Sequence, residues 1–506
     1  MPTSSFDDFV RRVASHRNTA EVAGGMAAIA VGWLVGKSIA GGKYGFVGML
    51  LGFLAFFLIY FRPRSMILLF PFVISMPNLS LGNPGPMAVS VQDAFWVVAF
   101  TGYVSRQIVG RKFIIPRNDN VIAPLWGFLA IAIICIYKVM ILKANLLVFN
   151  TKELMRLTMF SFTYIVMLDV LNSKKQIMRL TWWILIWGIW MMAISYYSYF
   201  TVSDFWYDLL VMKPAYIFMR HKFLRMISIA GSTSWTGIYY AILVALGIQF
   251  APFFKTRERR VWAIVYIIAM AGCILLTFNR GTWVGMLAGG VVLLLQGHID
   301  RRRVAGAVIL LLGLAVLVST SIFTPDAVGQ QVTDFVHYSR GSAESRVTRW
   351  VSAVNAVIDQ PLLGVGFNNF AFLLGHYSDE SGVNAERYGS PHNMFVDILT
   401  GTGLIGFSVF MLMIIRLHRQ MKDNMDGVLP PDLKLLSRGL YLSYIFFLGA
   451  SMFDSFIFKL HHTSYLIAAT WAMTSAIRRL RLGLVQDPEM AEFAAQNATA
   501  AAEKKT

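Results

Sequence analysis

The stretch GSPHNMFVDILTGTGLIG, residues 389–406, places Ser, Pro, His and Asn directly before a Gly-rich apolar segment. Ser followed by Pro is typical of a helix start, with Ser390 as the N-cap and Pro391 at the first helical position. His392 would then lie in the first turn, where unpaired backbone N–H groups and the helix dipole disfavour the imidazolium. A neutral His is what a general base requires, although a His in a first turn more often has a structural role.

Two further polar residues follow in the same predicted helix. Asn393 and Asp397 are one turn apart, so we expect them to orient the group that the His contacts. The glycines Gly401, Gly403 and Gly406 are typical of small residues that allow close helix packing. The sequence therefore predicts a helix that begins with a candidate base and continues as a packing element.

A second candidate is Arg280, in the segment LLTFNRGTWVG, where two apolar runs meet with a very short turn between them. Gly281 and Gly285 allow close backbone approach, so Arg280 is predicted to reach into a helix bundle. The alternative is an Arg that extends to lipid headgroups.

Further basic residues crowd the loop at 203–230, which contains VMKPAYIFMRHKFLRM. They are Lys213, Arg220, His221, Lys222 and Arg225. The alternation of the predicted spans places this loop outside the membrane, where translocated positive charge is disfavoured. We interpret the cluster as a site for a polyanionic ligand, with contacts to lipid headgroups as the alternative.

Membrane helices are the elements that must position these residues. Of the 506 residues, 56% are hydrophobic and 14% charged, and apolar runs of about twenty residues, the length that crosses a bilayer, recur along the chain. Soluble α/β enzymes have shorter apolar runs and charges spread throughout. About fourteen spans are predicted, near 21–40, 44–62, 65–80, 87–107, 120–142, 155–172, 180–202, 231–254, 261–278, 282–297, 304–323, 392–415, 438–458 and 463–478.

Cys135 and Cys273 both fall inside apolar runs, so neither a disulfide nor a metal-ligand pair is indicated.

Basic clusters between the spans predict the orientation of the chain. They lie at 62–64, 106–112, 174–175, 255–260, 298–303, 416–419 and 478–481, and the spans put them all on one side. The positive-inside rule makes that side the cytoplasm, so both termini are expected there. The net charge of +18 then reflects topology and contact with anionic lipids, and no nucleic-acid partner is predicted.

Spans and loops divide the chain into six segments. They are a cytoplasmic leader (1–20), N-terminal transmembrane helices (21–202), transmembrane helices with the basic outer loop and the Arg280 turn (203–323), a long outer loop (324–391), C-terminal transmembrane helices (392–481) and a cytoplasmic tail (482–506). The tail is Ala-rich and polar, so we expect it to be disordered or weakly helical.

The long outer loop contains SRVTRWVSAVNAVI and PLLGVGFNNF. Arg346 and Trp350 are four residues apart, and Ala353 and Val357 extend the same face, so the first segment is predicted to be an amphipathic helix. Two interpretations stay open, a helix that lies on the bilayer and a helix that simply packs the loop. The glycines of LLGVGF permit a tight turn.

Together, LTFNRGTWVG, SRVTRW with PLLGVGFNNF, and PHNMFVDILTGTGLIG resemble the bacterial O-antigen ligase and polymerase superfamily, over residues 215–420. Members polymerise or ligate lipid-linked glycans outside the cytoplasmic membrane. The resemblance implies an all-α polytopic membrane protein with a GT-C-like fold and a long periplasmic loop before the last three helices. It implies His392 as the catalytic base. The arginines proposed to bind pyrophosphate are Arg280, Arg225, Arg220 and Arg346.

The reaction implied by the resemblance is a single displacement. His392 takes a proton from an acceptor hydroxyl, which attacks the anomeric carbon as undecaprenyl pyrophosphate leaves, with no metal or cofactor. The expected partners are an undecaprenyl-pyrophosphate-linked glycan donor, membrane lipids, and an acceptor that is a glycan, a lipid A core or a protein. The expected location is the bacterial cytoplasmic membrane, with the active site facing the periplasm.

Two other functions remain open. A transporter or flippase of the same lipid-linked glycan would carry ionisable groups near the membrane midplane. Here Asp93, Arg156, Arg280 and Asp454 are predicted near outer helix ends. A peptidoglycan polymerase would instead depend on an outer acidic residue in place of the His.

Overall fold

The computed structural model describes most of the chain beyond its N-terminal region. The described residues are 55–75, 80–81, 89–110, 119–142, 147–201, 216–218, 224–226, 232–251, 254, 256–295, 346–377, 390–455 and 461–503. The leader at 1–20 and the spans predicted at 21–40 and 304–323 lie outside these ranges, as does most of the span at 44–62.

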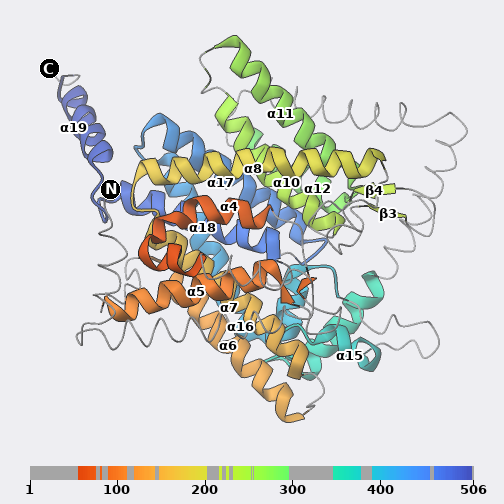
Figure 1. The fold of residues 1–506 in the computed structure, drawn as a ribbon. Coiled ribbons are helices and arrows are strands. Elements are labelled where there is room, and N and C mark those ends of the chain that lie inside the picture. Colours follow the sequence, from red (N-terminus) through yellow and green to blue (C-terminus); the bar gives the residue numbers. More distant parts are fainter. Residues whose placement is uncertain are drawn as a thin grey trace, which may run out of the picture.

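Within these ranges the chain is almost entirely helical, which confirms the all-α prediction (Figure 1). The helices are α4 (Met66–Ile74), α5 (Val91–Val109), α6 (Ile122–Leu142), α7 (Leu147–Val170), α8 (Lys174–Thr201), α10 (Thr233–Phe250), α11 (Arg257–Leu276), α12 (Arg280–Leu295), α15 (Phe370–Tyr377), α16 (Met394–Asp426), α17 (Pro431–Ser451), α18 (His461–Arg481) and α19 (Pro488–Glu503). Residues 55–61 and 346–359 are also helical, and η1 (Pro63–Ser65) is a 3-10 turn. Two short antiparallel hairpins pair β1 (Ser80–Leu81) with β2 (Val89–Ser90), and β3 (Tyr216–Phe218) with β4 (Leu224–Met226).

Each predicted span that falls on described residues overlaps a helix, but the spans at 65–80 and 87–107 extend into β1 and β2, and the span at 438–458 extends past the end of α17. Four of the described helices are long and apolar enough to cross a bilayer, namely Lys174–Tyr197, Thr233–Phe250, Arg257–Leu276 and Met394–Asp426. The chain is therefore a multi-pass membrane protein. The number of about fourteen spans, each about twenty residues long, stays a prediction.

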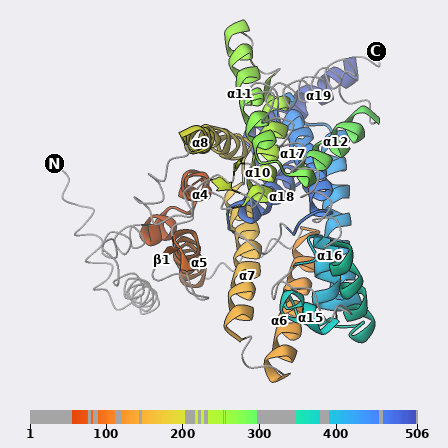
Figure 2. The same cartoon turned by 90° about the vertical axis from the view of Figure 1, so that its right-hand side faces the viewer.

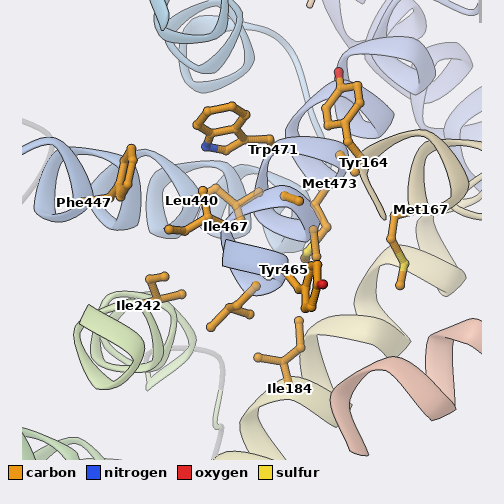
Figure 3. Packing of buried hydrophobic residues seen from close by; sticks show 14 of the residues in the cluster. Tyr164, Met167, Ile184, Ile242, Leu440, Phe447, Tyr465, Ile467, Trp471 and Met473 are labelled. Carbon is orange, nitrogen blue, oxygen red and sulfur yellow. The ribbon is translucent and has the colours of Figure 1, made fainter. Parts of the chain in front are cut away.

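The core of the bundle surrounds α18, whose side chains contact helices from distant parts of the sequence (Figure 3). The Trp471 ring lies edge-on to Phe160 of α7, with ring centroids 5.4 Å apart, and to Phe447 of α17 at 6.3 Å. Tyr164 of α7 shares a hydrogen bond of 2.7 Å with Ser475 of α18. Because aromatic edges pack favourably on neighbouring rings, these contacts fix α7, α17 and α18 side by side.

Helix α12 packs closely on α17 because both helices carry glycine at the contact. A Cβ atom at Gly449 would lie 2.7 Å from the Cα of Gly285, and one at Gly285 would lie 2.6 Å from the Phe446 carbonyl oxygen. Any larger residue would separate the two backbones. At the start of α12, a Cβ at Gly281 would lie 2.7 Å from Phe453. The expected close approach at Gly281 and Gly285 is confirmed, and it brings the start of α12 beside the end of α17.

Helix α16 is broken at Gly403, whose φ of 65° and ψ of −170° are not helical. The loop after the 346–359 helix fills the break, and the Leu404 N–H donates to the Pro361 carbonyl at 2.8 Å. The Val365 N–H donates to the Thr400 carbonyl at 2.9 Å. Figure 2 shows this segment, in teal, against α16. The prediction that Gly403 is only a small packing residue is therefore wrong, because its left-handed φ, which glycine adopts freely, makes room for a second backbone.

The two ends of the bundle are distinct. At one end the starts of α10, α12, α16 and α18 meet the ends of α11 and α17. At the other, Lys174 at the start of α8 forms an ion pair of 2.9 Å with Asp432 of α17.

The tail is more ordered than predicted, because α19 is a continuous helix at the second of these ends (Figure 1). Asp487 caps α19 by accepting the Glu489 N–H at 2.9 Å, and its other carboxylate oxygen accepts the Lys174 N–H at 2.8 Å. A side-chain cap of this kind stabilises a helix start, which the Ala-rich composition alone did not indicate.

Candidate active site

His392 precedes α16 instead of lying in its first turn. The N-cap is Asn393, whose side-chain oxygen accepts the backbone N–H groups of Phe395 at 3.0 Å and Val396 at 3.3 Å. Ser390, the predicted cap, accepts the His392 N–H at 3.3 Å in a turn before the helix. The prediction that Ser390 caps the helix is wrong, and the helix-dipole argument for a neutral His392 loses its basis.

The imidazole of His392 instead faces a carboxylate at the end of α17. Its Nδ1 lies 3.4 Å from Oδ1 of Asp454, and the side chains are 37% and 20% exposed. With Nδ1 directed at the carboxylate, Nε2 is the nitrogen that can accept a proton from a substrate. The arrangement is that of a base and its orienting acid, at the longer distance common in unliganded sites.

Asp454 is held as a carboxylate by several donors. Burial alone would raise the pKa of Asp454, but hydrogen bonds from His392, from the Ser234 hydroxyl and from the Ser455 backbone N–H hold that pKa below its ordinary value. The Ser455 N–H lies 2.8 Å from Oδ1. An ionised Asp454 is therefore placed to stabilise an imidazolium on His392.

Asp397 holds the same segment from α16. Its Oδ2 accepts the Ser455 hydroxyl at 2.9 Å. Ser455 is the neighbour of Asp454, which faces His392. Asp397 can therefore act on the group next to His392 through Ser455, as the sequence predicted. Asn393, in contrast, uses its side-chain oxygen to cap α16.

The backbone at His392 is strained. Its φ is 48°, and the other described non-glycine residues with positive φ are Phe278, at 49°, and Asn368, at 59°. Each lies in one of the three motifs that the sequence singles out. A non-glycine residue in this region costs about 1–3 kcal/mol, and such residues concentrate at functional sites.

The helix at 346–359 holds the loop in this conformation. Trp350 Nε1 donates to the Pro391 carbonyl at 2.8 Å, and Arg349 Nη1 donates to the Ser390 carbonyl at 3.3 Å. Two side chains of one helix thus fix the two peptide groups before His392. SRVTRW and SPHN, which are separate in the sequence, form one unit in the structure.

Arg280 is the first residue of α12, and a polar chain joins its turn to Asp454. Asn279 accepts the Thr282 N–H at 2.9 Å, and its amide nitrogen donates to the Ser234 hydroxyl oxygen at 2.6 Å. The Ser234 hydroxyl in turn donates to Asp454. The start of α12 and the His392–Asp454 pair therefore belong to one hydrogen-bonded system, and Arg280, which begins α12, is half-buried.

The remaining candidate arginines are less closely tied to this system. Arg346 begins the described part of the 346–359 helix and is half-buried. Arg225 lies in β4, where its backbone pairs with Ile217 of β3, but its side chain is outside the described set. Arg220 is also outside that set. Their proposed role in pyrophosphate binding stays a prediction.

Three residues of the site are not among the candidates predicted from the sequence. Asp454 appears in the sequence only as a charge at an outer helix end, and Ser234 and Asn279 as ordinary polar residues of GSTSWTG and LTFNRG. The one available signal was that an acidic residue ends an apolar run. Across the described ranges no group of three or more His, Cys, Asp or Glu side chains is arranged to hold a metal ion.

Comparison with known proteins identifies one family that part of the chain resembles. Residues 265–411 match the family described as O-Antigen ligase, a segment that includes Arg280, Arg346, His392 and Asp397. No curated protein matches the chain. The chain is thus a multi-pass membrane protein in which residues 265–411, less than a third of its length, are similar to the O-antigen ligase family.

Proposed function

We propose that this protein is a membrane glycosyltransferase that transfers a glycan from undecaprenyl pyrophosphate to an acceptor hydroxyl, with His392 as the base. The observation that carries the proposal is the His392–Asp454 pair at 3.4 Å, joined through Ser234 and Asn279 to the turn that bears Arg280. The match of residues 265–411 to the O-antigen ligase family supports a ligase or polymerase that acts on lipid-linked glycan.

In the proposed reaction Nε2 of His392 accepts the proton of the acceptor hydroxyl. The hydroxyl oxygen forms a bond to the anomeric carbon of the donor while the bond from that carbon to the pyrophosphate oxygen breaks. Attack and departure on opposite faces invert the anomeric configuration. Proton transfer to a positioned base of this kind is worth roughly 100- to 10,000-fold in rate. Asp454 stabilises the imidazolium that results.

The leaving group is a pyrophosphate, and its growing charge needs a cation. Arg280 supplies one at a helix start, where backbone N–H groups also favour an anion. The guanidinium pairs two oxygens at once, so this residue can serve where other glycosyltransferases use a divalent ion. Arg225, Arg220 and Arg346 are proposed to contact the same pyrophosphate or the glycan next to it.

The site is proposed to face the periplasm, with both termini in the cytoplasm. The basis is the distribution of Lys and Arg between the predicted spans. Cysteines introduced at 342 and 380 should react with a membrane-impermeant thiol reagent in cells whose outer membrane is opened, and a cysteine at 300 should not. Labelling at 300 without labelling at 342 would reverse the assignment.

Purified protein distinguishes this function from transport. Given a lipid-pyrophosphate glycan and EDTA, the enzyme should form a glycosidic bond, whereas a flippase would form none. Loss of activity with EDTA would contradict the metal-free mechanism. The glycan of a deletion strain then separates two acceptors, since loss of chain length indicates a polymerase and loss of attachment to a lipid A core or a protein indicates a ligase.

A further inference from the structure

The helix at 346–359 carries a continuous row of large apolar side chains on its exposed face. Val347, Val351, Val354 and Ile358 recur every three or four residues, and Leu362 follows at the same spacing; all five are 52–72% exposed. At 100° per residue the four that lie in the helix fall within ~60° of arc, and Leu362 lies in the turn that follows. We call these five residues the apolar stripe.

The opposite face of this helix is the one that contacts the protein, and its residues are small. Ala353 and Ala356 are fully buried against Val365, Phe370 and Leu374. A helix on a water-exposed loop normally buries its large apolar residues and exposes its polar ones. Here the large residues point outward, so the stripe requires an apolar environment that the described part of the chain does not provide.

The stripe is continuous with the outward face of a membrane-spanning helix. The Ile405 N–H of α16 donates to the Leu362 carbonyl at 3.2 Å, which joins the end of the stripe to the spanning segment. Leu404 and Ile405 are nearly half exposed, and Leu412 and Ile415 extend that exposed face along α16. Side chains of this kind on a spanning helix face lipid, so the stripe begins where the lipid-facing surface of α16 is already established.

We infer that the 346–359 helix lies in the bilayer interface on the side of the candidate site, with the apolar stripe in contact with lipid acyl chains. Trp350 borders the stripe and donates its N–H to the Pro391 carbonyl, which is the amphipathic placement that Trp takes at membrane surfaces. Of the two interpretations of this segment, the surface helix is the one supported.

The inference has a consequence for the loop that carries His392. Arg349 and Trp350 hold the Ser390 and Pro391 carbonyls from the same helix whose stripe rests in lipid. The bilayer surface thus sets the height of His392 relative to a lipid-linked substrate. The contact with lipid itself does not depend on the proposed reaction.

Lipid contact can be measured directly. Single cysteines at Val347, Val354 and Ile358 carry an environment-sensitive fluorophore, and the full-length protein is placed in nanodiscs of phospholipids brominated on their acyl chains. The native Cys135 and Cys273 are buried and do not compete for the label. Asp359→Cys is the matched control. Asp359 is exposed and is the last residue of the same helix, but it lies about 100° around the helix axis from Ile358 and so outside the stripe.

Quenching at the three stripe positions should exceed that at 359 by at least about twofold. Equal quenching at all four positions would overturn the inference. Disulfide cross-linking of Ile358→Cys between two copies of the chain, without lipid quenching, would also overturn it and would assign the stripe to self-association. Because neither readout uses turnover, an inactive preparation does not change the result.

Discussion

The two ends of the helix bundle carry different polar networks, and they differ in whether a polar side-chain atom stays accessible to a substrate. At the α8 and α17 starts, the Lys174 ammonium contacts Asp432 at 2.9 Å and Glu489 at 3.3 Å. At the opposite end, His392 faces one carboxylate at 3.4 Å, and more than a third of its ring is exposed. The first network satisfies its charges within the protein, whereas the second leaves a ring nitrogen for a substrate.

Asp119 and Asp454 show the same difference between two carboxylates. Oδ1 of Asp119 accepts the Val121 N–H, the Ile122 N–H and the Tyr164 hydroxyl, all donors that hold the start of α6. Asp454 accepts from Ser234 of α10, from the adjacent Ser455 N–H and from His392, whose backbone is strained. A carboxylate that caps a helix contributes stability. We propose that Asp454, which faces a strained and partly exposed His, contributes to the reaction instead.

The largest expected effect is at His392. His392→Gln keeps a hydrogen-bonding side chain but removes the proton acceptor, so product formation by purified enzyme should fall by roughly 100- to 10,000-fold with folding retained. His418→Gln is the matched control, because His418 lies on the same helix α16, between Tyr441 and Tyr444, far along the chain from the site. Near-normal activity in His392→Gln would return His392 to a structural role.

Arg280→Ala should follow, with a loss of roughly 100- to 1,000-fold in turnover, because the leaving pyrophosphate loses its cation. Arg280→Lys should recover little, since an ammonium does not reproduce a two-oxygen contact. Arg416→Ala is the control, because Arg416 donates to the Asn120 carbonyl at 3.1 Å, at the start of α6. Equal losses in both Ala variants would indicate that Arg280 only stabilises the fold.

Lys174→Met tests the other side of the comparison. Loss of the partly exposed contacts to Asp432 and Glu489 should cost about 1 kcal/mol and lower the Tm by about 1 °C in a chain of this length. Turnover per folded molecule should stay unchanged, as measured by thermal unfolding and product formation on one preparation. A turnover loss with an unchanged Tm would contradict the division between a stabilising end and a reactive end.

The smallest effect concerns acid stability. The folded protein holds the pKa of Asp454 below its ordinary value of 3.8, so the carboxylate stabilises the fold above that pH, and the stabilisation disappears as the pH falls through the lowered pKa. The Tm of the wild type should therefore drop more between pH 5 and pH 3 than the Tm of Asp454→Asn. If the Tm of both proteins falls equally with pH, the hydrogen bonds to the Asp454 carboxylate do not stabilise the fold.

Much of the fold is predictable from the sequence, because apolar runs of membrane length specify helices with little help from tertiary contacts. The break at Gly403 is different, since it depends on backbone groups of residues 361–365 that dock from a distant loop. Small glycines alone suggest packing, and nothing local in GTGLIG indicates that another chain segment enters the helix.

The sequence predicts which residue types form the site, but it does not predict which side chains contact each other. His392 and Arg280 stand out by their positions, but Asp454 lies 62 residues after His392 and on another helix. The Ser390–Pro391 signature also misleads, because Trp350 and Arg349 hold both carbonyls in a turn and leave Asn393 to cap the helix. Contacts between elements decide both outcomes, and they are not encoded in local spacing.

The central claim is that His392 and Asp454 act as one unit, and a double-mutant cycle tests it most directly. Product formation is measured for purified wild type, His392→Gln, Asp454→Asn and the double variant, under one set of lipid and pH conditions. If Asp454 acts through His392, the double variant should be no slower than His392→Gln alone. Losses that multiply would mean that the two residues contribute independently, and would contradict the account.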